Sequence, residues 1–165
     1  MDELRMVHIR RFCDEDAPQL WQLFFNTIRT VNRKDYTADQ VKAWAVDDLD
    51  PELWLQKMQS IEPFVAEIDQ AIVGYSDLQS DGLIDHFFCH HAHQNKGVGR
   101  VLMQHIFSEA ERRGIDKLYS HVSITAKPFY LHFGFEVIKQ QTLDVRGEQL
   151  INFCLEKSLS RDTVI

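Results

Sequence analysis

Apolar residues near the start of the chain recur at two different spacings. Residues 7–10 alternate apolar with polar side chains, which predicts a first strand. From about Ala17 the apolar positions recur three and four residues apart, which predicts a helix capped by Asp14 or Asp16. The apolar stripe of this helix comprises Leu20, Trp21, Leu23, Phe24, Phe25 and Ile28.

Two shorter helices are expected after it. Thr37 carries the hydroxyl of a good N-cap, and the helix that it precedes should run through Trp44. Pro51 suits the first turn of another helix, reaching Met58, because a first turn leaves its amides unpaired. The chain up to residue 58 is therefore expected to be mainly helical after its first strand.

The middle of the chain changes to runs that are typical of strands. Two apolar runs, 64–68 and 71–75, flank Asp69 and Gln70, which predicts a hairpin. A third apolar run covers residues 83–89. Together the three runs predict an antiparallel meander.

The second half alternates helices and strands. A helix is predicted over 98–113, with Val98, Leu102 and Ile106 on one apolar stripe and Gly114 as its C-cap. A strand, a helix and two strands should follow, at 117–122, 126–133, 135–138 and 150–155. A meander followed by a strand–helix–strand unit indicates a mixed α/β (α+β) fold.

Composition narrows the class of protein. The 165 residues suit one domain, expected over 1–158 with a short polar tail at 159–165. No apolar run is long enough for a membrane helix, and the first six residues include three charged ones, so we expect a cytoplasmic protein. A net charge of −7 argues against nucleic-acid or anionic-membrane partners and suits a cationic amine. Three widely spaced cysteines do not form a disulfide framework.

The candidate chemistry lies between the third apolar run and the helix at 98–113. Gly97 and Gly99 precede or open this helix, where unpaired amides and the helix dipole favour a phosphate group. Lys96 and Arg100 add positive charge, so a diphosphate is the natural ligand. A tight connection without a ligand would also use two glycines. Neither a Walker loop nor a dinucleotide fingerprint fits the spacing.

Two spaced motifs resemble the signatures of the GNAT superfamily of N-acetyltransferases. Gln94-x-x-Gly97-x-Gly99 is similar to the family's pyrophosphate signature, and Ser123-x-x-Ala126-x-x-Phe129-Tyr130-x-x-x-Gly134-Phe135 is similar to its second signature. Residues 27–44 also look like a branch of small GNAT proteins described only generally as acetyltransferases. The resemblance implies a mostly antiparallel sheet of about seven strands flanked by helices, with a splay between the fourth and fifth strands.

The resemblance also implies a site for acetyl-CoA as co-substrate, without a metal. The backbone at Phe88 and Cys89 would pair with the pantetheine arm. The segment that would hold the pyrophosphate comprises Gln94, Asn95, Lys96, Gly97, Val98, Gly99 and Arg100. Ser123 matches a position that touches the cofactor, although a helix-capping role is an equal reading.

Acetyl transfer to an amine needs a base, a proton donor and well-placed substrates. Tyr130 occupies the family's general-acid position, although it could instead be a core residue. Asp85 is the first candidate for the base, and His86 is a second candidate that also lies near the expected acceptor site. Tyr36 and Trp44 could line this site or belong to the core. The acceptor would be a small-molecule or peptide amine, and the last strands could pair two copies in a homodimer.

Three other readings stay open. His86, Cys89, His90, His91 and His93 are dense enough to suggest a metal site, or the loop histidines are simply solvated. Cys89 could act as a covalent nucleophile if a histidine activated it. The same fold could also form a module that binds or senses acyl-CoA without catalysis.

Overall fold

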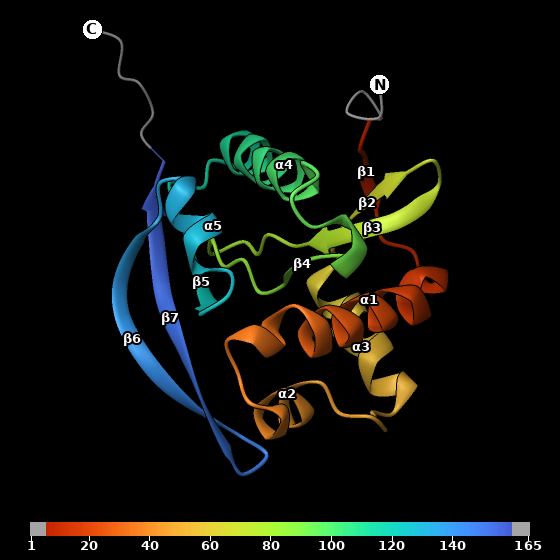
Figure 1. Ribbon diagram of the computed structural model, residues 1–165. Coiled ribbons are helices and arrows are strands. Elements are labelled where there is room, and N and C mark those ends of the chain that lie inside the picture. Colours follow the sequence, from red (N-terminus) through yellow and green to blue (C-terminus); the bar gives the residue numbers. More distant parts are fainter. Residues whose placement is uncertain (1–5, 160–165) are drawn as a thin grey trace, which may run out of the picture.

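Seven strands and five α-helices make up the described part of the computed structural model, residues 6–159 (Figure 1). The strands form two sheets, one of four strands in the order β1-β2-β3-β4 and one of three in the order β5-β7-β6. All pairs within the two sheets are antiparallel. The predicted mixed fold of about seven strands is therefore confirmed, with the strands divided between two sheets.

The first sheet is covered by a helix on each face. It contains β1 (His8–Arg11), β2 (Phe64–Ile68), β3 (Ala71–Ser76) and β4 (Phe87–Cys89), and its two long helices are α1 (Ala17–Thr30) and α4 (Val98–Arg113). Successive side chains of a strand point to opposite faces. Accordingly, Val65 packs in the cluster with α1, whereas Ala66 packs with Val98 and Leu102 of α4. Helices α2 (Ala38–Trp44) and α3 (Pro51–Ile61) lie beside α1.

Local signals account for most element ends in this half. Thr37 and Gln40 form a capping box at α2, and Gly114 ends α4 with φ of 72°. Asp69 and Gln70 both adopt positive φ in the tight turn between β2 and β3. Asp16 lies at the N-cap position of α1, as predicted, but its side chain makes no capping hydrogen bond there. The carboxylate of Asp16 instead accepts two hydrogen bonds from Arg10, at 2.8 and 2.9 Å.

The second sheet is dominated by a long two-stranded ribbon. It comprises β5 (Lys117–Ser123), β6 (Glu136–Val145) and β7 (Glu148–Ser158), with α5 (Lys127–His132) between β5 and β6. Strands β6 and β7 extend well beyond the predicted 135–138 and 150–155. β6 is an edge strand with mostly exposed and polar residues, so its sequence lacks the apolar alternation that identifies a strand.

The two sheets separate between β4 and β5. Across this gap, an isolated parallel bridge joins Leu83 to Tyr119, and the Ile84 amide donates to the Tyr119 carbonyl at 2.9 Å. The predicted splay is thus present. The strand expected over 83–89 is wrong in its first half, because only residues 87–89 pair with β3.

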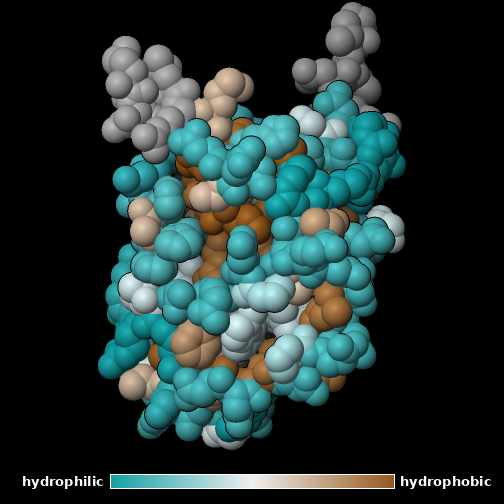
Figure 2. All heavy atoms as spheres, turned by 90° about the vertical axis from the view of Figure 1, so that its right-hand side faces the viewer, coloured by the Kyte–Doolittle hydropathy of each residue, from teal (hydrophilic) through white to brown (hydrophobic). Residues whose placement is uncertain are grey.

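The surface is largely polar. On the face turned toward the viewer in Figure 2, hydrophilic side chains predominate and apolar ones gather in a recess in its upper half. Four of the large exposed apolar side chains lie on the ribbon: Val137, Ile138, Leu143 and Ile151. The pairing of two copies through these strands stays a prediction. No helix within residues 6–159 is long and apolar enough to cross a membrane. Of the expected tail at 159–165, all residues after Leu159 lie outside the described part of the chain.

Candidate active site

A cavity of about 290 Å³ lies where the two sheets separate. Seven of the predicted site residues line it: Tyr36, Trp44, Asp85, His86, Phe88, Ser123 and Tyr130. They come from the α1–α2 segment, from the strand at β4, from β5 and from α5. A second hollow of about 360 Å³ lies between α1 and α3 around Trp21 and Trp54, and none of the predicted site residues lines it. The first cavity is therefore the candidate active site.

The glycine segment beside this cavity has the backbone of an anion cradle. Asn95 and Gly97 have φ of 63° and 86°, and Gly97 is the N-cap of α4. Open space surrounds the position of a Cβ at Gly97, so the positive φ alone favours glycine there. Gly99 has a different reason, because its Cβ would lie 2.9 Å from Cε1 of Phe129. The segment thus exposes amides of a helix start, a suitable site for phosphate oxygens.

The polar side chains of this segment have separate roles. Gln94 turns back and donates its Nε2 to the Cys89 carbonyl at 2.8 Å, which ties the loop to the end of β4. Lys96 and Arg100 are exposed. The Arg100 guanidinium lies 5.9 Å from the centre of the Phe133 ring. Positive charge is therefore available at the rim of the cradle.

The edge of β4 that faces the splay carries backbone groups of alternate residues. The His90 amide donates to the Val73 carbonyl at 2.8 Å, in register with the β3–β4 pairs. In an antiparallel ladder the bonded positions alternate, so Phe88 directs its backbone groups to β3. Phe87 and Cys89 direct theirs to the open edge. The Cys89 carbonyl is already occupied by Thr27 Oγ1 at 3.0 Å and by Gln94. The Phe87 carbonyl and the Cys89 amide are the better partners for an added strand-like ligand.

Tyr130 places a buried phenol at the cavity. Burial raises the pKa of Tyr130 well above its ordinary value, so the phenol is protonated at neutral pH. Its oxygen lies 3.5 Å from Ser120 Oγ, a long contact, because the Ser120 hydroxyl donates to the Ile84 carbonyl at 2.7 Å. Ser120 is therefore only a weak partner for the Tyr130 hydroxyl, which can donate its proton to a ligand.

Asp85 and His86 present two different groups to the cavity. The Asp85 carboxylate accepts a hydrogen bond from Lys57 Nζ at 2.6 Å. Burial lowers the pKa of His86 to about 4, so its imidazole is neutral at physiological pH. Its Nδ1 lies 3.0 Å from the hydroxyl of Tyr75, which is itself fully buried. Asp85 is thus the charged group of the pair, and His86 is neutral and held by Tyr75.

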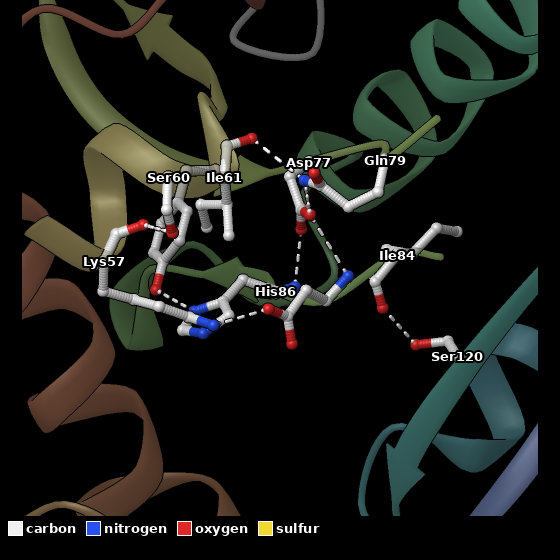
Figure 3. A network of polar contacts seen from close by, with 10 residues as sticks. Lys57, Ser60, Ile61, Asp77, Gln79, Ile84, His86 and Ser120 are labelled. Atoms are coloured by element: carbon white, nitrogen blue, oxygen red, sulfur yellow. Dashed lines mark hydrogen bonds and ion pairs between the residues drawn. The ribbon is translucent and has the colours of Figure 1, made fainter. Parts of the chain in front are cut away.

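Asp77 is a residue of this site that the sequence analysis missed. It is fully buried, and its Oδ1 accepts the His86 amide at 2.6 Å (Figure 3). Its Oδ2 accepts from Gln79 Nε2 at 2.6 Å and from the Asp85 amide at 3.3 Å. Burial raises the pKa of Asp77 to about 6. The signal that could have found it is a carboxylate between Tyr75 and Leu78, directly after an apolar strand.

Three predicted contacts with ligands are also structural. The Tyr36 hydroxyl donates to the Ile151 carbonyl at 2.6 Å and accepts from the Ile124 amide at 2.9 Å, which joins the two halves of the molecule. The Trp44 ring packs edge-on against Tyr36 and is only half-buried. Ser123 Oγ accepts the Ala126 amide at 3.0 Å in the turn before α5, whose N-cap is Ala126, so Ser123 holds this turn and does not cap the helix itself. All three line the cavity with the rest of their surface.

The histidine and cysteine alternatives gain no support. His90 and His91 stack with ring centres 4.4 Å apart, and no group of three His, Cys, Asp or Glu side chains among residues 6–159 could hold a metal ion. Burial raises the pKa of Cys89 to about 12, which makes its thiol a poor nucleophile near neutral pH. The His90 Nδ1 is occupied as well, because it accepts the Ala92 amide at 3.0 Å.

Comparisons with known proteins agree with this geometry. The model of the acetyltransferase (GNAT) domain family matches residues 32–157. An uncharacterised N-acetyltransferase of Escherichia coli K12, YafP, is 29% identical over 147 residues, which cover 89% of this chain and 93% of YafP. A GCN5-related N-acetyltransferase of Rhodopseudomonas palustris, whose structure is also titled a class-II aminotransferase, superposes with a TM-score of 0.88 and 26% identity. The match covers 92% of this chain and 95% of that one.

A further structure shows the same fold with a cofactor. PaiA N-acetyltransferase from Thermoplasma acidophilum, solved in complex with coenzyme A, superposes with a TM-score of 0.71 and 18% identity, over 93% of this chain and 99% of that one. Because the family model matches about three quarters of the sequence, this chain belongs to the GNAT family of acetyltransferases.

Proposed function

We propose that this protein transfers the acetyl group of acetyl-CoA to a primary amine by direct attack, with both substrates bound together. The observation that carries the proposal is the cavity at the splay. It brings Tyr130 and Asp85 to one space, beside the open edge of β4 and the helix start at Gly97. An acyl donor lying along β4 would reach this space from one side, and an amine from the other.

The residues of the cradle fit the cofactor. The amides from Asn95 to Arg100 would hold the pyrophosphate, where the helix dipole and the exposed side chains of Lys96 and Arg100 favour negative charge. The Phe87 carbonyl and the Cys89 amide would pair with the pantetheine arm, as a strand pairs with a sheet edge. PaiA, which has the same fold, was solved in complex with coenzyme A, and this supports coenzyme A as the ligand of the cradle.

Acetyl-CoA supplies the acetyl thioester, and the chain supplies position and proton transfer. Asp85, which also holds Lys57, attracts the ammonium form of the acceptor and takes its proton. The free amine nitrogen attacks the thioester carbonyl carbon, and the carbon–sulfur bond breaks. Tyr130 gives its proton to the departing sulfur, and the second proton that the nitrogen loses as the amide forms returns to the Tyr130 oxygen. The neutral His86 lies beside the reacting amine and adds no competing positive charge.

The test substitutes Tyr130→Phe, which removes one hydroxyl and keeps the ring in the core. We expect kcat to fall by about 10² to 10⁴, because one positioned proton donor is lost, while the Kd for coenzyme A changes less than threefold. Tyr119→Phe, which removes an exposed hydroxyl bonded to Asp81, is the matched control and should keep full turnover. Asp85→Asn should lower kcat/KM by a similar factor, more than His86→Gln does.

Two results would contradict the proposal. If the wild-type chain binds coenzyme A but acetylates no amine of a broad panel, the alternative of a non-catalytic acyl-CoA-binding or sensing module replaces it. If Tyr130→Phe and Tyr119→Phe have equal kcat, Tyr130 is a core residue only.

A further inference from the structure

We infer that the acceptor is a small primary amine on an uncharged apolar or aromatic body, without a carboxylate or phosphate group. This inference rests on the proposed function and narrows its substrate class. It follows from what the cavity at the splay offers to the part of the acceptor that does not react.

Much of the cavity wall is apolar. Phe24 of α1, Phe88 of β4 and Trp44 of α2 present aromatic rings to it. The ribbon of β6 and β7 contributes Leu143, Val145, Leu150 and Ile151. Leu143 and Ile151 remain 39% and 37% exposed at this place. An apolar acceptor would cover them, and removing apolar surface from water favours binding.

Charge in the cavity is limited to one carboxylate. Asp85 is the single acidic residue among the described side chains that line it, and no Lys or Arg lines it. The ammonium that contacts the lining residue Asp85, that of Lys57, is already bound to this carboxylate. A carboxylate on the acceptor would therefore lose its water without gaining a cation, which costs several kcal/mol. A second ammonium on the acceptor would likewise find no second carboxylate. Amino acids and polyamines are thus poorly matched.

One polar atom remains for orientation. Asn152 Oδ1 is buried and without a hydrogen-bond partner, and Asn152 lines the cavity opposite Ser123 on the neighbouring strand. A buried carbonyl oxygen that accepts no hydrogen bond is costly, so a ligand N–H that donates to Asn152 Oδ1 would be favourable. The amine itself is the donor that an otherwise apolar acceptor must carry. Asn152 and Asp85 together would then fix the nitrogen and leave the body to the apolar walls.

A matched pair of amines tests the inference. 2-Phenylethylamine and phenylalanine share one ring and chain and differ by a carboxylate. We expect kcat/KM for 2-phenylethylamine to exceed that for phenylalanine at least 100-fold, measured as coenzyme A thiol released by the full chain. Spermidine and a short peptide with a free N-terminus should also be poor acceptors. Asn152→Leu should raise KM for 2-phenylethylamine several-fold.

A variant pair separates the cavity from the general surface. Leu143→Arg places a cation at the cavity and should reduce the ratio of kcat/KM for 2-phenylethylamine to kcat/KM for phenylalanine at least tenfold. Val137→Arg changes an equally exposed residue of the same strand, 41% exposed and outside the cavity, and should leave the preference unchanged. Turnover with phenylalanine, spermidine or the peptide but not with 2-phenylethylamine would overturn the inference alone. No thiol release with any amine would overturn the proposed function and this inference with it.

Discussion

The opposite titrations of Asp77 and His86 give a sharp test of the site's electrostatics. The pKa of Asp77 is raised from 3.8 to about 6 by burial, so its contribution to stability is present below the lower value. It is lost as the pH rises through 6. The pKa of His86 is lowered from 6.5 to about 4, so its contribution is present above 6.5 and is lost as the pH falls toward 4. Each group contributes up to about 3 kcal/mol to the free energy of unfolding.

Between pH 4 and 6 the two contributions change in opposite directions and nearly cancel in the wild-type protein. His86→Gln leaves only that of Asp77, since Asp77 binds the backbone amide of residue 86. The free energy of unfolding of the wild type minus that of His86→Gln should therefore increase by up to about 3 kcal/mol from pH 4 to 6.5. Water that reaches His86 from the cavity makes this an upper value. The free energy of unfolding of the wild type minus that of Asp77→Asn should decrease by a similar amount from pH 4 to 6.

Urea unfolding followed by tryptophan fluorescence at several pH values between 4 and 7 measures these differences. His132→Gln, which removes an exposed imidazole from α5, is the control and should run parallel to the wild type. The reasoning is refuted if the His86→Gln difference stays constant across this range, because the folded protein would then bind the His86 proton as readily as the unfolded chain does.

Two further predictions concern the cofactor segment. Gly99→Ala should lower the free energy of unfolding by about 1–3 kcal/mol, and with it the melting temperature, because the added methyl group overpacks against Phe129. Gly97→Ala should lower the free energy of unfolding by about 1–2 kcal/mol, because residue 97 has a positive φ. Equal melting temperatures for Gly99→Ala and the wild type would contradict the packing argument. Because burial raises the pKa of Cys89 to about 12, iodoacetamide at pH 8 should label the exposed Cys13 at least tenfold faster, and Cys89→Ser should retain kcat within threefold.

Where the sequence predicted correctly, the determinant was local. The glycines at 97 and 114 bound α4 because each adopts a positive φ next to a helix end. Thr37 caps α2 because its hydroxyl reaches an amide three residues away. The tight turn at Asp69 and Gln70 is likewise set by two residues. The family motifs then placed the phenol of Tyr130 at the cavity, which periodicity alone could not do.

Where prediction was incomplete, the determinant lies elsewhere in the chain. The dual role of Tyr36 depends on the Ile151 carbonyl, more than a hundred residues away. The length of β6 depends on pairing with β7 and not on its own side chains, which are mostly exposed. The ion pair that occupies Asp85 comes from Lys57 on α3. Such long-range partners leave no spacing in the sequence by which they could be recognised.

The β3–β4 ladder ends beside the splay at one side chain. If the β3–β4 ladder continued in register, Asp77 would lie opposite His86, and the His86 amide would donate to the Asp77 backbone carbonyl. That amide donates to the Asp77 carboxylate instead, at 2.6 Å. The ladder ends there, and the preceding residues turn to β5, where Ile84 bonds Tyr119 and Ser120. A buried carboxylate thus replaces one step of a sheet, and the cavity opens where the strands part. The same carboxylate fixes the backbone of Asp85 and His86 at the cavity wall, so one buried side chain holds the proposed base at the point where the ladder ends.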